Sequence, residues 1–591
     1  MRFIHKKHIL AILSCLLIMS ACNKEFLEPE PLSFFAPENT FVDKAGFEGL
    51  LLSCRKQLRH EYYGDNSTIS TEYFLSDLAV NAGPEANKPH NLEIQILPTG
   101  TSEARIMKGN GSYWALAWDG IKYANIAISR IDNIEWDNKE DRNSILAEGY
   151  FHRSYWYYRL VHQFGDVPLI IQEVTKPRLD LYSNTRESIL KQLMKDMEYA
   201  VQWLPQEVLQ GQVNRAAGYH LLTKIYLSLR EFDKAIEAAS WVINSSGHTL
   251  MSNRFGVYAD DPKYDVMWDL HQKENKSSAE NREAILVVQD KYDMEGDHGG
   301  GTQVMRNAVP CWWWSPVLDP SGKRGVTDHD TNGQPLLDSL GRGIGRVRSA
   351  NYYNYEIWSD PNDLRHSDVN WWSKDEFYYN NPSSDYYLQP FVKDALKDTI
   401  RTWYPFAYNK LYVKDEERAG SSDIRGGHSD WYVFRLAGTY LLRAEAYFWK
   451  GDLGSAAEDI NAVRRRAQAS DVVPGDVTIE YIFAERAREL YMESPRKTEL
   501  TRVAYIMAKL GKDGYSLESM SDDNWFYDMV MKHNVFYRDE ISYGANIYRM
   551  LPYHVYWPIP QESIDANTQG HVNQNPGYPG SATNVPPLGE Q

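Results

Sequence analysis

The sequence predicts a mainly α-helical protein, in which a scaffold of paired helices is split by a long, loop-rich insertion that carries short strands. Apolar residues recur at steps of three and four on both sides of the middle of the chain. Two helix pairs echo each other, with Tyr219 in the first pair matching Tyr440 in the second. Residues 251–430, which lie between the pairs, are instead dense in Gly, Pro, Asn, Asp and aromatic residues.

Each helix pair shows an apolar stripe along one face. The first pair comprises residues 217–229 and 232–243, and the second comprises residues 440–447 and 453–463. The stripes follow the 3.6-residue period of amphipathic helices, and alanines at the crossing points allow two antiparallel helices to approach closely. This layout resembles tetratricopeptide-type helical repeats, which stack several copies.

Other segments extend this scaffold. Helical periodicity predicts further helices over residues 113–134, 144–164, 185–203 and 479–493. Inside the insertion, Ala284–Val288 is predicted as a short strand and most of the remainder as structured loops. The tail after Tyr553 is rich in Pro and Asn, and we expect it to wrap the body in an extended conformation.

The first residues predict export and attachment to a lipid. A basic tip precedes an apolar run from Ile9 to Met19, which is too short to span a bilayer, and the small residues Ser20 and Ala21 lead into Cys22. The stretch 18–22 resembles the bacterial lipoprotein box, with Met19 where Leu is usual. We therefore expect a signal peptide at 1–21 and acyl chains on Cys22 that anchor the mature protein; ordinary secretory cleavage is the alternative.

The expected division of the mature chain follows from these patterns. It consists of an N-terminal helical region at 22–250, the aromatic, loop-rich insertion at 251–430, and a C-terminal helical region with an extended tail at 431–591. Binding residues concentrate on loops that a rigid scaffold holds, so the insertion is the first place to look for a site.

Composition excludes some classes of function. A formal net charge of −17 argues against binding to nucleic acid, because phosphates require Lys and Arg as partners. Four cysteines are too few for a disulfide scaffold; Cys54 and Cys311 could form one bridge. The 18 Trp, 40 Tyr and 19 Phe are the more informative feature, since Tyr and Trp combine an apolar ring with a polar tip and suit both wet interfaces and sugar rings.

Several motifs in a fixed order carry a family resemblance. The strongest is a helical stretch at 147–155 that continues into Phe-Gly-Asp-Val-Pro-Leu at 164–169, with Gly149 where Ala is usual and His152 where Leu is usual. With this stretch and the lipobox, the chain resembles the SusD/RagB family of outer-membrane, nutrient-binding lipoproteins. Further matches lie at 443–447, 459–464, 485–489 and 573–578.

The resemblance implies a fold, a function and partners. It implies a tetratricopeptide-like body that sits as a lid on a SusC-like, TonB-dependent transporter in the outer membrane and faces the cell exterior. It also implies binding of oligosaccharides, or of peptides in some members, with no chemistry performed and no cofactor required. Charged residues inside the motif helices are expected to form ion pairs between helices rather than to catalyse a reaction. They are Glu148, Arg153, Glu445, Arg464, Glu485 and Arg488.

Consecutive tryptophans are the candidate sugar-binding residues. Adjacent side chains diverge in regular structure, so Trp312, Trp313 and Trp314 are not expected to face one core together, and at least one ring is expected at a surface. An indole ring can stack on the C–H face of a pyranose. Trp371 and Trp372 are the second candidates. Packing and contact with the transporter are the alternative roles.

Two loops are weaker candidates. The polar loop 81–110 contains Asn87, His90 and Arg105, whose side chains can bond sugar hydroxyls. The stretch 328–333 places oxygens of Asp328, Asp330 and Asn332 as in a calcium loop, although the position that needs a bidentate Glu holds Ser339. A structural calcium ion is therefore one interpretation, and an Asn-Gly turn explains the same residues.

No motif predicts catalysis. The sequence contains no phosphate-binding loop, nucleophile elbow, zinc His pair or Cys-x-x-Cys, and Gly341, Gly343 and Gly345 lack the spacing and strand–helix context of a dinucleotide loop. We therefore expect a binding protein and not an enzyme. A secreted glycoside hydrolase remains the alternative, because paired carboxylates are too common among 80 acidic residues to identify or exclude a catalytic dyad.

Overall fold

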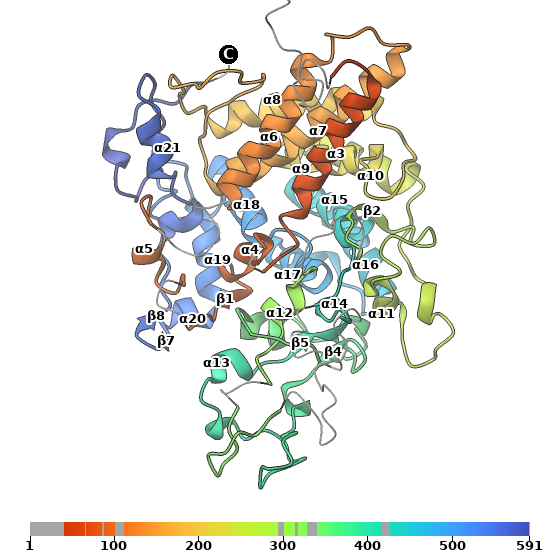
Figure 1. Ribbon diagram of the computed structural model, residues 1–591, viewed down its shortest axis with the longest axis vertical. Helices are drawn as coiled ribbons and strands as arrows, with labels where there is room; N and C mark the ends of the chain where they lie inside the picture. Colours follow the sequence, from red (N-terminus) through yellow and green to blue (C-terminus); the bar gives the residue numbers. More distant parts are fainter. Residues whose placement is uncertain are drawn as a thin grey trace, which may run out of the picture.

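Helices form one end of the molecule, and loops of the insertion form the other (Figure 1). The structure is a computed structural model. It describes residues 41–65, 67–84, 88–100, 112–292, 301–313, 317–327, 340–415 and 426–589. The description below is limited to these residues.

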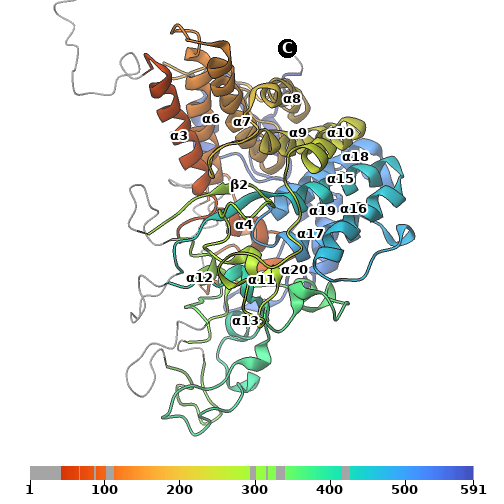
Figure 2. The same cartoon turned by 90° about the vertical axis from the view of Figure 1, so that its right-hand side faces the viewer.

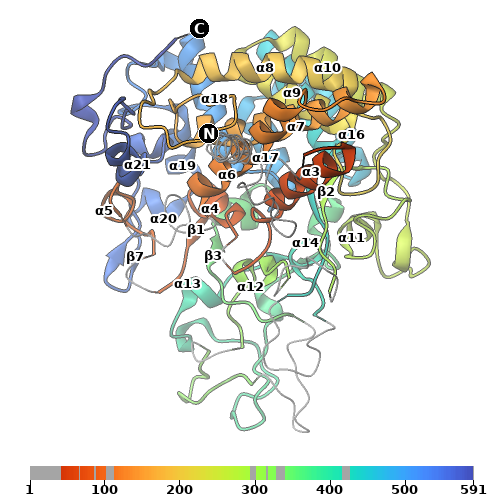
Figure 3. The same ribbon diagram turned by 45° about the horizontal axis from the view of Figure 1, so that its top comes forward.

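The helical end is a stack of helices, most of which pack on the next helix of the stack. Figure 3 shows α8 (Arg186–Trp203), α9 (Arg215–Leu229) and α10 (Phe232–Ser245) side by side across the top of this stack. The observed bounds confirm the predicted helix pairs and the four further helices, each to within a few residues. The helices are α6 (Tyr113–Arg130), α7 (Lys139–Gln163), α8 (Arg186–Trp203), α9 (Arg215–Leu229), α10 (Phe232–Ser245), α15 (Leu436–Lys450), α16 (Leu453–Arg466) and α17 (Ile479–Leu490).

The two predicted repeats are neighbours in space, because α10 packs directly on α15. The insertion therefore leaves the stack and returns to it without breaking the packing. Both repeats close their first helix with a residue in the left-handed region, Arg230 (φ 66°) in one and Gly451 (φ 81°) in the other. Gly adopts this conformation without strain, whereas Arg230 adopts it while its guanidinium pairs with Glu187 at 3.0 Å.

The first described helix, α3 (Lys44–Arg59), packs across α6 and α7 and beside β2 (Ala284–Val288). Figure 2 shows the lower end of α3 next to this strand. β2 confirms the predicted strand, and it pairs antiparallel with β6 (Trp431–Arg435), with two irregularities in its register. The insertion is thus tied to the scaffold where the chain leaves and re-enters it.

The remaining strands are short and form two-stranded ladders. β1 (Ala79–Asn81) pairs with β3 (Val347–Ser349), β4 (Trp371–Trp372) with β5 (Phe406–Ala407), and β7 (Ser542–Tyr543) with β8 (Asn546–Ile547). The other α-helices are α4 (Ile69–Phe74), α5 (Leu92–Gln95), α11 (Val266–His271), α12 (Val304–Ala308), α13 (Thr399–Thr402), α14 (Tyr408–Leu411), α18 (Arg496–Leu510), α19 (Trp525–His533), α20 (Val535–Arg538) and α21 (Gln561–Ala566).

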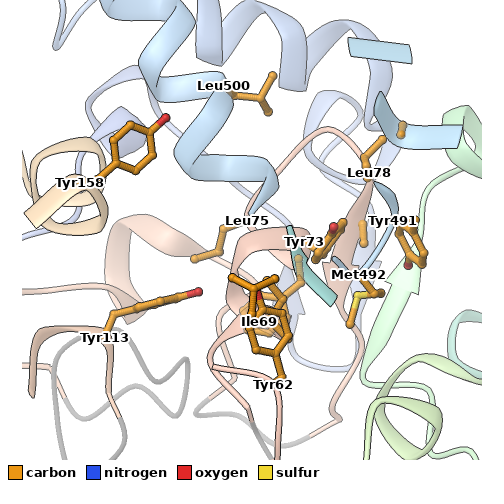
Figure 4. Close-up of a cluster of buried hydrophobic side chains, with 14 of the residues drawn as sticks. Tyr62, Ile69, Tyr73, Leu75, Leu78, Tyr113, Tyr158, Tyr491, Met492 and Leu500 are labelled. Atoms are coloured by element: carbon orange, nitrogen blue, oxygen red, sulfur yellow. The ribbon is translucent and has the colours of Figure 1, made fainter. Parts of the chain in front are cut away.

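Tyrosines fill much of the core where α4, α18 and the scaffold meet (Figure 4). The ring of Tyr73 packs edge-on against Tyr491 with centroids 4.9 Å apart, and its hydroxyl donates to the carbonyl of Ser494 at 2.6 Å. Tyr158 donates its hydroxyl to Glu499 at 3.0 Å. Both of these buried hydroxyls have a partner, so two large apolar rings are removed from water without leaving their polar tips unpaired.

The charged residues of the motif helices form buried ion pairs, as predicted. Arg153 on α7 pairs with Asp196 on α8 at 2.7 Å, and Glu445 on α15 pairs with Arg502 on α18 at 2.6 Å. Glu485 on α17 accepts from Arg464 on α16. Burial by itself would raise the pKa of Glu485, but the guanidiniums around it, those of Arg365, Arg488 and Arg464, outweigh burial and lower the pKa to about 2.

The C-terminal tail lies along the scaffold, and two of the sequence motifs meet there. Gly165 adopts φ 68° just after α7, where an added Cβ would lie 3.2 Å from the side chain of Asn575. The Asn575 amide in turn donates to the carbonyls of Phe164 and Trp557, at 2.9 and 2.7 Å. The 164–169 and 573–578 motifs are therefore parts of one joint that fixes the tail on the body.

Cys54 and Cys311 are both buried, free thiols, so the possible bridge between them does not form. Burial raises the pKa of the Cys54 thiol well above its usual range and that of Cys311 to about 12. Protonated, buried thiols act as small apolar groups.

Across the described ranges, none of the helices combines the length and the apolar character that crossing a membrane requires.

Candidate functional site

The first two tryptophans of the predicted sugar-binding run are in the core. Trp312 and Trp313 are only 4% and 7% exposed. Their indole N–H groups donate to the carbonyls of Gly341 and Gly343 at 2.9 and 2.6 Å, and Arg342 covers the ring of Trp313 with its guanidinium 4.2 Å from the centroid. Because neither ring offers an exposed face, the structure does not favour sugar stacking at these two positions.

The second pair of tryptophans lies in the β4–β5 ladder. Trp371 is buried against Trp358 and His366, at centroid distances of 5.3 and 4.5 Å. Trp372 is half-buried and packs 5.6 Å from Tyr408, whose ring stacks on Tyr412. These ring faces are occupied by one another, so the aromatic row is a packing layer more than an open platform.

Of the remaining predicted residues only His90 can be placed. His90 is buried between the rings of Tyr543 and Tyr548, at 5.4 and 5.2 Å. The other predicted residues lie outside the described residues, and the predictions made for them stand as predictions. They are Cys22, Asn87, Arg105, Trp314, Asp328, Asp330 and Asn332.

Two open hollows of the described surface meet at the end of strand β2. One is a hollow of about 780 Å³ between α3, the loop 209–212 and the residues that follow β2. The other is a hollow of about 400 Å³ between residues 273–277, the residues that follow β2, and residues 428–430, which precede β6. Asp290 and Lys291 line both hollows, so together they form one groove, which we call the β2 groove.

Asp290 fixes the middle of the β2 groove. Its carboxylate is buried and pairs with Arg59, the last residue of α3, while its second oxygen lies 2.8 Å from Nδ1 of His428. Its backbone N–H donates to the carboxylate of Asp430 at 3.0 Å. Asp290 thus connects α3, the end of β2 and the residues just before β6. The groove wall is therefore built from elements that are distant in sequence.

A second set of contacts supports the wall from behind. The hydroxyl of Tyr63, just beyond α3, lies 2.8 Å from the carbonyl of Val288 and 3.1 Å from that of Ser429. Lys276 donates to the Ser429 hydroxyl at 2.9 Å and lies over the ring of Trp431. Burial lowers the pKa of Lys276 to about 8, against the opposing effect of Asp430. The polar groups behind the wall are engaged with each other, which holds the groove rigid.

Tyr292 gives the smaller hollow an exposed aromatic ring. Its side chain is 55% exposed, and its ring lies 5.5 Å from that of His428 at an angle of 55°. Glu274, Lys273 and Lys291 lie around it. An exposed aromatic ring surrounded by donors and acceptors is an arrangement that suits a ligand with both apolar and hydroxyl surfaces.

The two buried carboxylates of the β2 groove already have hydrogen-bond partners. Asp290 and Asp430 accept from Arg59, His428 or backbone N–H groups, and the described residues include no cluster of three or more His, Cys, Asp or Glu that could hold a metal ion. The possible calcium loop at 328–333 lies beyond the described ranges.

Comparison with known proteins assigns the class to which this helical scaffold belongs. The model of the SusD family matches residues 266–578, more than half of the chain, and a second model, described as "Starch-binding associating with outer membrane", matches residues 47–227. The chain therefore belongs to the SusD family. The resemblance found in its motifs is confirmed, and so is the mainly helical fold.

Individual relatives share little sequence identity with this chain, but two of the three alignments below cover most of its length. SusD-like protein P25 of Formosa agariphila is 22% identical over 568 residues, which cover 92% of this chain and 94% of that protein. SusD-like protein P2 of the same organism is 27% identical over 270 residues, 45% of this chain and half the length of P2. The solved structure of surface glycan-binding protein A from Bacteroides thetaiotaomicron, in complex with laminarihexaose, shares 19% identity and has a TM-score of 0.63; the match covers 90% of this chain and 99% of that one.

Proposed function

We propose that this protein is a cell-surface lipoprotein that binds an oligosaccharide in the β2 groove and passes it to a SusC-like, TonB-dependent transporter in the outer membrane. Acyl chains on Cys22 anchor it, and no covalent bond of the ligand is broken. The observation that carries the proposal is the exposed ring of Tyr292 in a rigid, polar groove of a SusD-family scaffold.

Several findings support sugar as the ligand class. The glycan-binding protein of similar fold was solved with laminarihexaose bound, and the family description that matches residues 47–227 names starch binding. In the groove itself, the exposed ring of Tyr292 can cover the C–H surface of a sugar ring, while Lys291, Glu274 and Lys273 line the positions around it. The described part of the chain contains no comparable exposed ring among the tryptophans that the sequence had suggested.

Tyr292→Ala tests the site. We expect this variant to weaken binding of an oligosaccharide by about tenfold, because loss of one aromatic contact costs on the order of 1 kcal/mol beyond its lost area. Native affinity electrophoresis against starch, laminarin, xyloglucan and galactomannan identifies a ligand, and titration calorimetry with the corresponding oligosaccharide measures the affinity.

The matched control is Tyr387→Ala, since Tyr387 is similarly exposed at 44% but does not line the groove. It should bind like the unchanged protein. If the protein binds peptides and none of the glycans, the proposal is contradicted. It is also contradicted if the pure protein releases reducing ends from a polysaccharide. If the Tyr292→Ala variant binds the oligosaccharide as tightly as the unchanged protein, the binding site does not include Tyr292.

A further inference from the structure

The larger hollow of the β2 groove differs in chemistry from the smaller one. Its walls are one face of α3, with Leu52, Lys56 and Arg59, and the loop 209–212; its floor is the end of β2 with residues 289–291. Leu52 and Leu209, which line this hollow, are 63% and 76% exposed. The hollow therefore offers apolar surface that is open to solvent and within reach of charged groups.

Basic residues dominate the lining. Arg55, Lys56, Arg59 and Lys291 face a single acidic residue, Asp290, although the chain as a whole carries a net charge of −17. Such a local reversal of sign concentrates the field in a cavity with low-dielectric walls and attracts anions.

The two arginines are structural, which leaves the lysines for a ligand. Arg55 makes two hydrogen bonds to Glu148, at 2.6 and 2.8 Å, and Arg59 pairs with the buried carboxylate of Asp290. Lys56 and Lys291 are exposed, and neither forms an ion pair with any residue in the part of the chain that the structure describes. The surplus positive charge therefore lies at the mouth of the hollow.

The loop that forms the far wall is fixed in place. Gly211 has φ 88°, and a Cβ added there would lie 2.8 Å from Oε1 of Gln289. The N–H of Gln212 donates to the carbonyl of Leu209 at 3.1 Å, which closes the turn that presents the Leu209 side chain. The glutamines Gln210, Gln212 and Gln289 add amide donors and acceptors between the leucines and the lysines.

We propose that this hollow binds an acidic sugar residue, with its carboxylate or sulfate group between Lys56 and Lys291. The apolar face of the ring lies on Leu52 and Leu209, and glutamine amides bond its hydroxyls. A neutral sugar carries no charge to pair with the two lysines, and a small inorganic anion has no apolar surface to cover the two leucines. An acidic pyranose contacts both the lysines and the leucines. The inference rests on the proposed function, because Lys291 links this hollow to the Tyr292 ring in one continuous groove.

The test compares acidic and neutral oligosaccharides on a matched pair of variants. The first variant, Lys56→Gln/Lys291→Gln, removes both free cations of the hollow. The second, Lys263→Gln/Lys512→Gln, removes two exposed lysines that line neither hollow. Calorimetry uses oligogalacturonate as the carboxylate probe, a sulfated carrageenan oligosaccharide as the sulfate probe, and laminarihexaose as the neutral probe, each at low and at physiological salt.

We expect the unchanged protein to bind at least one acidic probe more tightly than the neutral probe, and to lose that preference as salt rises. The Lys56→Gln/Lys291→Gln variant should lose about tenfold in affinity for the acidic probe, the size expected for two exposed charge pairs, and most of its salt dependence. The control variant should keep both the affinity for the acidic probe and its salt dependence. Which acidic probe responds distinguishes carboxylate from sulfate.

The failures are distinguishable. If neutral oligosaccharides bind and depend on Tyr292, but acidic probes bind no better or are indifferent to the two lysines, the acidic-sugar inference is wrong and the proposed function stands. If no oligosaccharide of either kind binds, the proposed function fails and the inference fails with it. Binding of a polyglutamate peptide that depends on the lysines, without binding of either acidic glycan, also overturns the inference.

Discussion

Replacing Glu489 by alanine is expected to destabilise the protein by about 3–5 kcal/mol, the range observed when one partner of a buried ion pair is removed. Glu489 is fully buried on α17. Oε1 accepts from Arg435 at 2.9 Å and from Arg466, and Oε2 accepts from Arg365 at 3.1 Å. Burial by itself would raise the pKa of this carboxyl, but the three guanidiniums outweigh burial and hold it well below its usual range.

Alanine at this position would leave Arg435, Arg466 and Arg365 with Glu283, Glu485, Glu493 and Asp363 as carboxylate partners. Glu485 also pairs with Arg464 and Arg488, and Glu493 also pairs with Lys410, so the buried cluster would hold an excess of positive charge. The measurement is the midpoint of urea unfolding. Glu458→Ala is the control, because this carboxylate is 68% exposed and pairs with Arg465 at 3.3 Å; it should change stability by less than about 0.5 kcal/mol. Equal midpoints for both variants would contradict the role given to the buried cluster.

Gly120→Ala is expected to destabilise the protein by about 1–3 kcal/mol or more, the usual cost of forcing extra volume into a packed core. Gly120 lies where α6 crosses α7, and a Cβ at this position would lie 2.1 Å from both Cδ1 and Nε1 of Trp156. Trp156 is completely buried, so its ring has nowhere to move without displacing the helices.

Gly49→Ala, in α3, is the matched control because nothing lies within 4 Å of the added Cβ. Alanine there should stabilise the protein by about 0.5–1 kcal/mol, since Gly is unfavourable in an exposed helix interior. Thermal unfolding of the two variants should therefore shift in opposite directions. A Gly120→Ala protein as stable as the unchanged one would show that α6 and α7 are not packed as described.

Helices with a clean apolar stripe could be predicted from the sequence, and α18 (Arg496–Leu510) shows why others could not. Much of the buried surface of α18 is polar: Lys497, Thr498, Glu499, Thr501 and Arg502 all lie inside. These residues are satisfied by partners on other elements, such as Lys224 on α9 for Glu499 and Glu445 on α15 for Arg502. A search for apolar periodicity treats these buried polar residues as solvent-facing, so it does not detect the helix.

The tryptophan run shows the limit of a local argument. Divergence of adjacent side chains holds in a strand or helix, but Trp312 and Trp313 lie in an irregular segment, where both rings are buried and donate to carbonyls of one stretch, those of Gly341 and Gly343. The segment 341–345 makes this possible, because Gly343 has no room for a Cβ, which would lie 2.3 Å from the carbonyl of Val309. Gly343 and Gly345 permit the close approach of two backbones, and no spacing rule links them to the tryptophans.

The β2 groove was missed for a similar reason. Strand β2 was predicted at its observed residues, and Asp290 and Tyr292 follow it directly, but their significance depends on Arg59 and His428. These partners are far away in the chain and lie in segments without a motif. The one local signal is a Tyr after an Asp-Lys pair at the end of a buried strand, which is too common to identify a site.

Hydrogen–deuterium exchange of the purified protein, with and without a saturating oligosaccharide identified by electrophoresis, tests the central claim most directly. Ligand in the β2 groove should slow exchange of backbone amides in 273–277, 289–292 and 428–430, which form the smaller hollow. The helices α15 to α17 should be unchanged and serve as the internal reference. Protection confined to the distal loops around Tyr378 and Tyr387, with none at these three segments, would contradict the account.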